Sequence, residues 1–216
     1  MTRCAVLLLI ALAADTPTID PIHLRLLRQA VVVWMPFEAG GPGVAASPLM
    51  ADDPDSANDA ARADIAARAG LKVGARFTDD DRQKVDALRS GLPAALVLFI
   101  ERATLAPGTY PYRDPAPADP TAPRAEPAEP PVLAFTADHQ TLLKALRWEG
   151  MYVDLKRPYG EQMYFELEMA EWLGESVKRD KVGRPDFTPA QRARYERLHR
   201  EMQPALQVFL ENARLP

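Results

Sequence analysis

Apolar residues near the C-terminal end of the chain recur at the spacing of an α-helix. Counted from Leu198, they lie at i, i+4, i+7, i+8, i+11 and i+15, on one face of a helix: Leu198, Met202, Ala205, Leu206, Phe209 and Ala213. No polar residue interrupts this face, so we predict that it packs in the core. A groove for an apolar ligand is the alternative that the same pattern allows.

The same pattern occurs earlier in the chain. The segment Phe187–Leu215 aligns with Phe77–Leu105 at a constant offset of 110 residues and without a gap. Ten aligned positions hold identical residues: Phe77/Phe187, Thr78/Thr188, Arg82/Arg192, Leu88/Leu198, Ala95/Ala205, Leu96/Leu206, Phe99/Phe209, Glu101/Glu211, Ala103/Ala213 and Leu105/Leu215. We therefore interpret the chain as a tandem pair of related helical units.

Local signals predict where the two long helices begin. Thr188 can accept a hydrogen bond from a first-turn N–H group, Pro189 suits the first helical position, and Gln191 completes a capping box. Thr78 has the same place in the first copy, and the three aspartates that follow it lie at the positive end of the helix dipole.

A proline lies inside each long pattern, at Pro93 and at Pro204. A proline within a helix removes one backbone hydrogen bond and crowds the preceding turn. We expect each proline to kink its helix or to separate two abutting helices.

A shorter helix opens each unit. Asp20-Pro21 gives a cap and a first-position proline to a helix over 22–29, and Thr136-Ala137 opens its counterpart over 138–147. At an offset of 116, His23 and His139 superimpose at the same first-turn position.

A second helix follows in each unit, over Ala60–Ala69 and over Tyr164–Leu173. Gly70 and Gly174 come directly after these segments, in the position that favours glycine at a helix end. The match predicts that both units have the same order of three helices.

Two short segments between the helices are compatible with β-strands. Val31–Met35 and Trp148–Val153 are rich in β-branched and aromatic residues. For the first segment, continuation of the preceding helix is an open alternative. The units then diverge, and whether Pro42 or Pro48 matches Pro158 stays open.

Prolines are dense over Ala106–Pro131, which predicts a semi-rigid extended linker between the units. Recognition of this segment as a proline-rich ligand is the alternative. We expect Tyr110 to pack back onto the first unit and close it. The predicted fold is all-α, with a first helical unit over 15–110, a linker over 111–131 and a second helical unit over 132–216.

The segment Met1–Ala14 has the pattern of a secretory signal peptide. Arg3 precedes the apolar run Cys4–Leu12, and Ala11-Leu12-Ala13 fits an A-x-A cleavage site. We therefore predict a periplasmic or secreted protein. A buried N-terminal helix in a cytoplasmic protein is the alternative.

Composition narrows the possible partners. The net charge of −4 gives no global attraction to nucleic acid or to anionic lipid. Cys4 is the only cysteine, which excludes disulfides within the chain and cysteine-based metal sites. The three histidines are not at metal-ligand spacing, and we expect no metal and no cofactor.

One pattern of residues covers nearly the whole second unit: His139, Leu142-Leu143, Trp148, Asp154, Lys156–Gly160, Glu168-Met169-Ala170, Leu173-Gly174, Leu198-His199-Arg200-Glu201 and Ala205-Leu206. Through this pattern the unit resembles a family of uncharacterised bacterial helical proteins. The first unit matches in outline only. Because the family has no established activity, the resemblance supports the unit boundaries and implies no reaction.

One polar constellation in the second unit is a candidate ligand-binding site: His139, Asp154, Lys156, Arg157, Tyr159 and Glu168. The Lys-Arg pair lies in a turn, where it could hold a carboxylate or a phosphate. A histidine there could act as an acid or a base near neutral pH. The competing interpretation is a solvated turn whose ions cap neighbouring helices.

A basic stretch of the last helix contains four arginines around Tyr195. Glu196 is four residues from both Arg192 and Arg200, so intrahelical ion pairs should neutralise much of this charge. We therefore expect no nucleic-acid partner.

The sequence carries no Gly-rich phosphate loop, metalloprotease motif or serine elbow. The function that it favours is a non-catalytic helical module that binds a protein partner. The alternative is a small-anion receptor or an enzyme that uses the second unit's His/Asp/Lys/Arg group.

Overall fold

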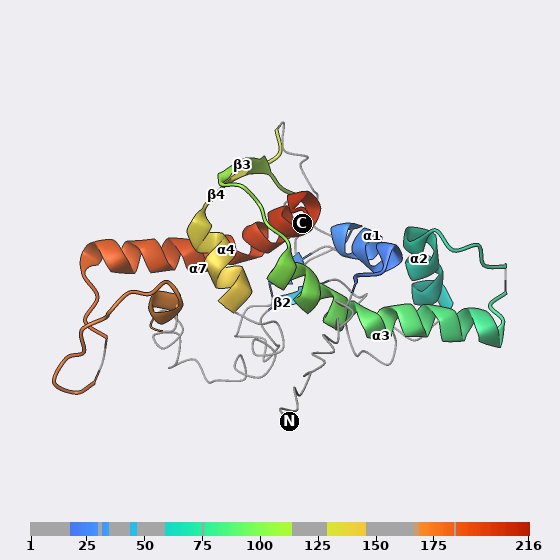
Figure 1. Ribbon diagram of the computed structural model, residues 1–216, viewed down its shortest axis with the longest axis horizontal. Helices are drawn as coiled ribbons and strands as arrows, with labels where there is room; N and C mark the ends of the chain where they lie inside the picture. The colour runs from blue at the N-terminus through green and yellow to red at the C-terminus, as the bar shows by residue number, and fades with distance from the viewer. Residues whose placement is uncertain are drawn as a thin grey trace, which may run out of the picture.

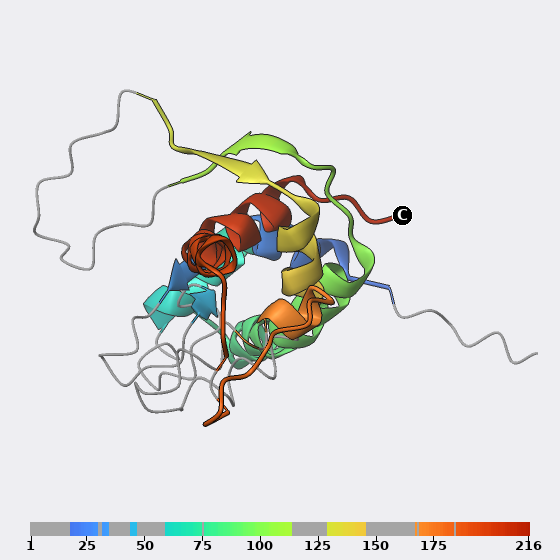
Figure 2. The same ribbon diagram turned by 90° about the vertical axis from the view of Figure 1, so that its left-hand side faces the viewer.

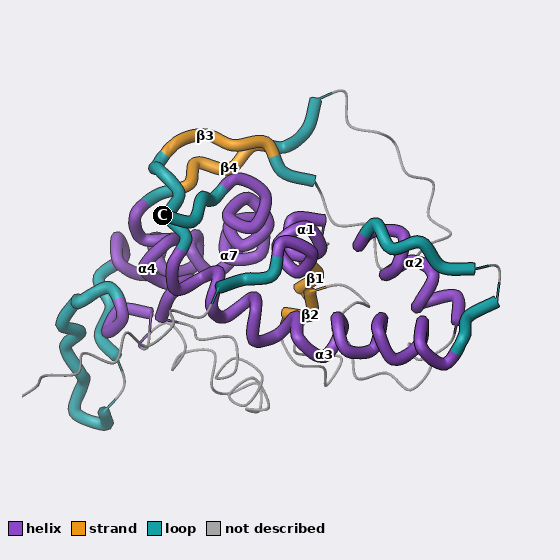
Figure 3. Tube along the Cα trace, turned by 45° about the vertical axis from the view of Figure 1, so that its right-hand side comes forward, coloured by secondary structure: helices purple, strands orange, loops and turns teal. Residues whose placement is uncertain are grey.

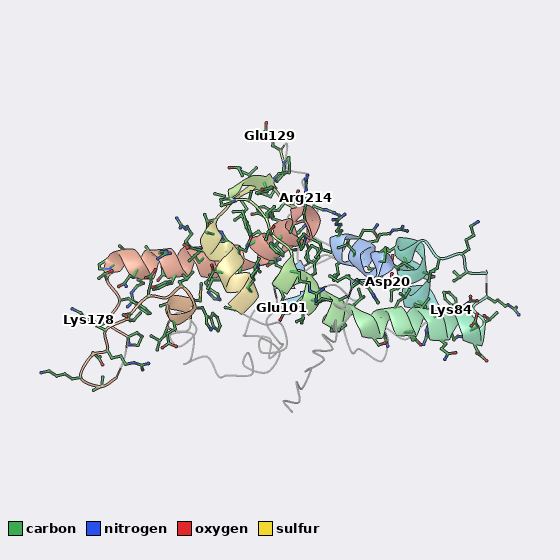
Figure 4. All side chains as sticks on the ribbon, viewed as in Figure 1. Asp20, Lys84, Glu101, Glu129, Lys178 and Arg214 are labelled. Carbon is green, nitrogen blue, oxygen red and sulfur yellow. The ribbon has the colours of Figure 1, made fainter. Side chains whose placement is uncertain are left out.

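Two long helices form the frame of the molecule in the computed structural model (Figure 1). The structure describes residues 18–29, 32–34, 44–46, 59–74, 76–113, 129–145, 167, 169–183 and 185–216. Helix α3 spans Asp79–Arg102 and helix α7 spans Pro189–Asn212. They enter from opposite ends of the molecule, and their C-terminal halves meet at its centre. The labelled side chains Lys84 and Lys178 mark these two ends in Figure 4.

Both long helices begin at the predicted caps. The Thr188 hydroxyl accepts a hydrogen bond from the Gln191 backbone N–H, and the Gln191 side chain accepts one from the Thr188 N–H. Thr78 and Asp81 form the same reciprocal pair in α3. Each helix runs through its internal proline as one element. The expectation of two abutting helices is therefore wrong, because flanking turns keep the helix continuous despite the lost bond.

The predicted apolar face of α7 is buried. Every residue of the pattern counted from Leu198 is at most 3% exposed. The corresponding residues of α3 are buried too, except Leu88, which is partly buried at the edge of the core. The rings of Phe99 and Phe209 contact each other edge to face, with centroids 5.8 Å apart. One continuous apolar core thus includes residues from both predicted units.

Three shorter helices pack around this core: α1 over Pro21–Gln29, α2 over Asp59–Ala69 and α4 over Ala137–Ala145. The Asp20 carboxylate accepts a hydrogen bond of 2.7 Å from the Ile22 N–H, as expected of a cap. Residues 167 and 169–172 are also helical.

The two predicted glycine stops have the same geometry. Gly70 and Gly174 adopt positive φ angles of 72° and 74°, which glycine reaches without steric cost. In each case the N–H of the following residue, Leu71 or Glu175, bonds to a carbonyl five residues earlier. This pattern closes both helices with a Schellman motif.

Two small antiparallel sheets accompany the helices. Strand β1 over Val32–Trp34 pairs with β2 over Val44–Ala46, and β3 over Gly108–Pro111 pairs with β4 over Val132–Phe135. Figure 2 shows β3 and β4 side by side above the helices, and Figure 3 shows β1 and β2 at a separate place near α1. The described chain is thus mostly helical with small two-stranded sheets.

The pairing of β3 with β4 was not predicted from the sequence. Both strands lie beside the proline-rich stretch, whose composition hides the alternation of a four-residue strand. The Tyr112 N–H also donates to the Pro131 carbonyl at 2.9 Å, so the ends of the predicted linker lie together. Tyr110 packs against Phe135 of β4 rather than only onto its own unit.

Several sequence-based expectations lie outside the described residues. They include the signal peptide over Met1–Ala14, the strand over Trp148–Val153 and the centre of the linker. Among the helices that the structure does describe, none is long and apolar enough to cross a membrane.

Candidate functional site

The structure describes one of the six candidate site residues. His139 lies in the first turn of α4. Asp154, Lys156, Arg157, Tyr159 and Glu168 lie outside the described residues. Their convergence on His139 therefore stays a prediction, and the geometry of the site is built from His139 and its neighbours.

His139 takes the place of the acid in a capping box. Thr136 precedes α4 as its cap, and its backbone N–H donates to His139 Nδ1 at 3.0 Å. The Thr136 hydroxyl lies 2.9 Å from the same nitrogen. A residue at the third helical position that accepts from the cap N–H is the second half of a capping box. The imidazole performs the task that Gln191 and Asp81 perform in α7 and α3.

This bond fixes the tautomer of the ring. A backbone N–H can only donate, so Nδ1 must carry a lone pair and the proton of the neutral ring must be on Nε2. His139 Nε2 lies 3.2 Å from Glu201 Oε2 and donates to it. The ring links the start of α4 to the middle of α7 through both nitrogens.

The surroundings of the ring favour its neutral form. The side chain is 1% exposed and stacks on Phe135, with ring centroids 5.5 Å apart. Burial lowers the pKa of His139 below its ordinary value of 6.5, and the attraction of Glu201 offsets only part of this effect. Protonation of Nδ1 would also point a proton at the Thr136 N–H. In this arrangement His139 offers neither an exposed lone pair nor an exposed proton.

A second polar cluster ties α4 to α7 beside His139. The Arg194 guanidinium donates to Asp138 Oδ2 at 2.7 Å and also bonds to Glu175. The Tyr195 hydroxyl donates to the other oxygen of Glu175 at 2.5 Å. Burial raises the pKa of Tyr195, and the nearby Glu175 carboxylate adds to the shift. The cluster connects α4, the loop after Gly174 and α7.

This cluster corrects the interpretation of the basic stretch. Tyr195 is fully buried, whereas the sequence had grouped it with the arginines of a basic stretch. Its position three residues before Leu198 on the apolar face was the signal that could have predicted this. The arginines also have partners other than Glu196: Arg197 lies 3.7 Å from Glu201, and Arg192 lies over the Phe187 ring.

A pocket of about 220 Å³ lies between α4 and the segment that follows α3. Its lining combines apolar atoms with one cation: Leu105, Pro107, Ala137, Gln140, Thr141 and Lys144. The Gln140 side-chain oxygen accepts a hydrogen bond from the Leu105 N–H at 3.0 Å, so this amide holds the end of α3 in place. One polar group of the pocket, the Gln140 amide, thus joins α4 to the segment that follows α3.

Within the described ranges, no group of three or more His, Cys, Asp or Glu side chains is placed to hold a metal ion. Comparisons of the chain with models of known protein families, with curated proteins and with solved structures find no match.

Proposed function

We propose that this protein is a non-catalytic helical module that binds a protein partner. The proposal rests on one observation, which is that the His139 ring is buried and hydrogen-bonded within the fold. The one candidate acid or base that the structure describes is buried, and its two ring nitrogens bond to Thr136 and Glu201. A histidine with these bonds stabilises the fold and is not exposed to a substrate. This favours a binding role over a catalytic role for the other five candidate site residues.

The proposed architecture is a tandem pseudo-repeat of two three-helix units joined by the proline-rich linker. Its support comes from the matched ends of α3 and α7, which have the same length, the same capping box and the same C-terminal geometry at Ala103 and Ala213. The Gly70 and Gly174 stops match as well.

The two superimposed histidines supply a further argument for the repeat. His23 lies in the first turn of α1, and its Nε2 is 3.1 Å from the Leu88 carbonyl of α3. A Cβ atom at Gly91 would lie 2.8 Å from this ring. Gly91 aligns with Glu201 at the offset of 110, and Glu201 is the partner of His139. Each histidine therefore contacts the same position of the long helix that follows it.

The Lys156-Arg157 pair is the proposed contact point for the partner. The second unit has this pair, and the first unit has no counterpart to it. A carboxylate or phosphate group on the partner would match the planar donors of arginine and the point charge of lysine. Asp154, Tyr159 and Glu168 are proposed to orient the pair.

Affinity capture with the full-length chain tests this proposal. The bait variants are Lys156→Ala/Arg157→Ala and the control Lys178→Ala/Lys181→Ala, which removes the same charge from exposed positions of the same unit. We expect a host protein to bind the wild type and the control, and to lose at least tenfold in affinity for the first variant. The melting temperature should change little, because the proposal places the pair on a solvated contact surface, where charges contribute about 0–1 kcal/mol.

A different outcome would favour the small-anion receptor or the enzyme. In that case no protein is enriched, whereas inorganic phosphate or acetate raises the melting temperature of the wild type and not of Lys156→Ala/Arg157→Ala. A variant that unfolds would instead assign the pair to the structure of the turn.

Export of the protein remains part of the proposal. Cleavage after Ala13 would leave a mature chain that begins at Ala14. Mass spectrometry of the protein from its native host decides this point, because retention of Met1–Ala13 in intracellular protein would contradict export.

A further inference from the structure

We propose that the two halves of this chain meet across an approximate two-fold axis, and that the same interface forms between two chains when the connection from β3 to β4 is too short to turn back. The partner that the surface fits is the complementary half of a second copy of the protein. The inference rests on the proposed pseudo-repeat, because it requires the two halves to present equivalent faces to each other.

The first observation is a reciprocal backbone contact at the ends of the long helices. The Thr104 N–H donates to the Arg214 carbonyl, and the Arg214 N–H donates to the Thr104 carbonyl, both at 3.0 Å. Thr104 and Arg214 align with each other at the offset of 110. A pair of equivalent residues that exchange identical bonds is what a two-fold axis between them produces. Figure 4 shows the labelled Arg214 about midway along the long axis of the molecule.

The second observation comes from the core on the same axis. Phe99 and Phe209 also align at the offset of 110, and their rings contact each other. Both rings are fully buried. Helix α1 packs against α7 as well as α3, and α4 packs against α3 as well as α7. Each half thus uses the same elements to reach the other, as in a dimer of identical subunits.

The strand pair shows how the interface could form between chains. The chain leaves β3 at Tyr112 and returns antiparallel at Pro131, where these two residues bond to each other. If the connection between Tyr112 and Pro131 were too short to turn back, β3 and β4 would form one continuous strand. The pairs Gly108↔Phe135 and Pro111↔Val132 would then form between two chains in the same antiparallel register. Exchange of an identical element between copies is a known low-cost route to dimers.

A deletion and a matched control test this inference. The deletion variant joins Tyr112 directly to Pro131, which leaves no residues for a turn. The control variant places Asn-Gly between them, a sequence that favours a two-residue hairpin turn. By light scattering after gel filtration, we expect the deletion variant to have twice the mass per particle of the full-length chain. The Asn-Gly variant should keep the mass of the full-length chain.

A disulfide shows whether the same contact forms. Thr104→Cys and Arg214→Cys are introduced into both variants, with Cys4→Ser to remove the native cysteine. Paired antiparallel residues of this kind have Cα atoms about 5.5 Å apart, within the range of a disulfide. The deletion variant should cross-link as a two-chain band on a non-reducing gel, and the Asn-Gly variant as a one-chain band. A folded deletion variant that is monomeric, or that does not cross-link between chains, would overturn the inference.

A second measurement keeps the test decisive if the deletion variant does not fold. A specific protease site is inserted after Arg124 of the full-length chain, and the folded protein is cleaved there. The two halves should co-elute as one particle at micromolar concentration, and separation would overturn the inference. Because neither experiment involves a binding partner, failure of either one leaves the proposed function untouched.

Discussion

At the scale of single residues, His139 shows how a polar side chain can be committed to the fold. Its ring closes the first turn of α4 through Nδ1 and reaches α7 through Nε2. Both bonds require the neutral ring in one tautomer. Burial makes the charged form still less favourable, so stability should depend on pH through this residue.

We expect the free energy of unfolding to fall as the pH drops below 6.5. Because the pKa of His139 is lowered in the folded protein, the unfolded chain takes up the proton more readily. The contribution is therefore fully present above pH 6.5 and is lost as the pH falls through the folded pKa. Urea unfolding across this range measures it.

The variant His139→Gln is the matched comparison for the pH effect. Glutamine can complete the capping box without titrating, as Gln191 does in α7. The pKa of His199 is also lowered, by burial and by Arg200, so His199→Gln serves as the control. If His139→Gln keeps the full pH dependence of the wild type, His139 does not have the proposed role.

Gly91 gives a second prediction at this scale. Alanine in place of a helical glycine ordinarily stabilises a protein by about 0.5–1 kcal/mol. Here the new Cβ would lie 2.8 Å from the His23 ring, which would have to move and lose its contact with Leu88. We expect Gly91→Ala to give no gain or a loss in the wild type, and the ordinary gain in a His23→Ala background. Urea unfolding of the four proteins measures this coupling, and an equal gain in both backgrounds would contradict it.

For the candidate site, the sequence could predict where His139 lies along its helix but not which residues it contacts. The sequence indicated that His139 lies in the first turn of a helix. It did not indicate that the ring faces Glu201, because that contact joins residues 62 positions apart. The Arg194 bonds to Asp138 and Glu175 are of the same kind, since each depends on how α4 and the loop after Gly174 pack on α7.

At the scale of elements, the two long helices supply nearly half of the buried apolar residues among those that the structure describes. Phe209 is fully buried and contacts both Phe99 and Phe135. Phe209→Ala should therefore lower the free energy of unfolding by about 3–5 kcal/mol, as for buried aromatic residues in general. Chemical unfolding measures the loss.

An exposed apolar residue is the control for this substitution. Val182 is 73% exposed, and Val182→Ala should change stability by no more than about 0.5 kcal/mol. A loss below about 1 kcal/mol for Phe209→Ala would mean that the assignment of the buried face is wrong.

The helices were predictable because their signals are local. The caps at Thr78 and Thr188, the glycine stops and the apolar period are all contained within one or two turns. The pairing of β3 with β4 was not, because it brings together Tyr110 and Leu133 from either side of a proline-rich stretch. A two-stranded sheet of this length depends on the helices beneath it.

At the scale of the whole molecule, the two halves share one apolar core and are not separate domains joined only by a linker. Residues that the proposed repeat makes equivalent contact each other: Phe99 and Phe209 inside the core, and Thr104 and Arg214 at its exposed edge. The alignment of the two segments suggested a repeat, but it did not predict these contacts, since an alignment does not specify how two segments pack on each other. The described polar side chains around His139 are used in holding the second half together, which is the basis for proposing a binding module rather than an enzyme.

The most direct test of this account is the protonation state of His139 in the full-length chain. Imidazole ¹⁵N chemical shifts report tautomer and charge, and His139→Gln assigns the signal among the three histidines. We predict a neutral ring with its proton on Nε2, titrating only below pH 6.5 and unchanged by inorganic phosphate. A ring protonated on Nδ1, a pKa at or above 6.5, or a saturable shift with phosphate would show that His139 is available for chemistry and would contradict the account.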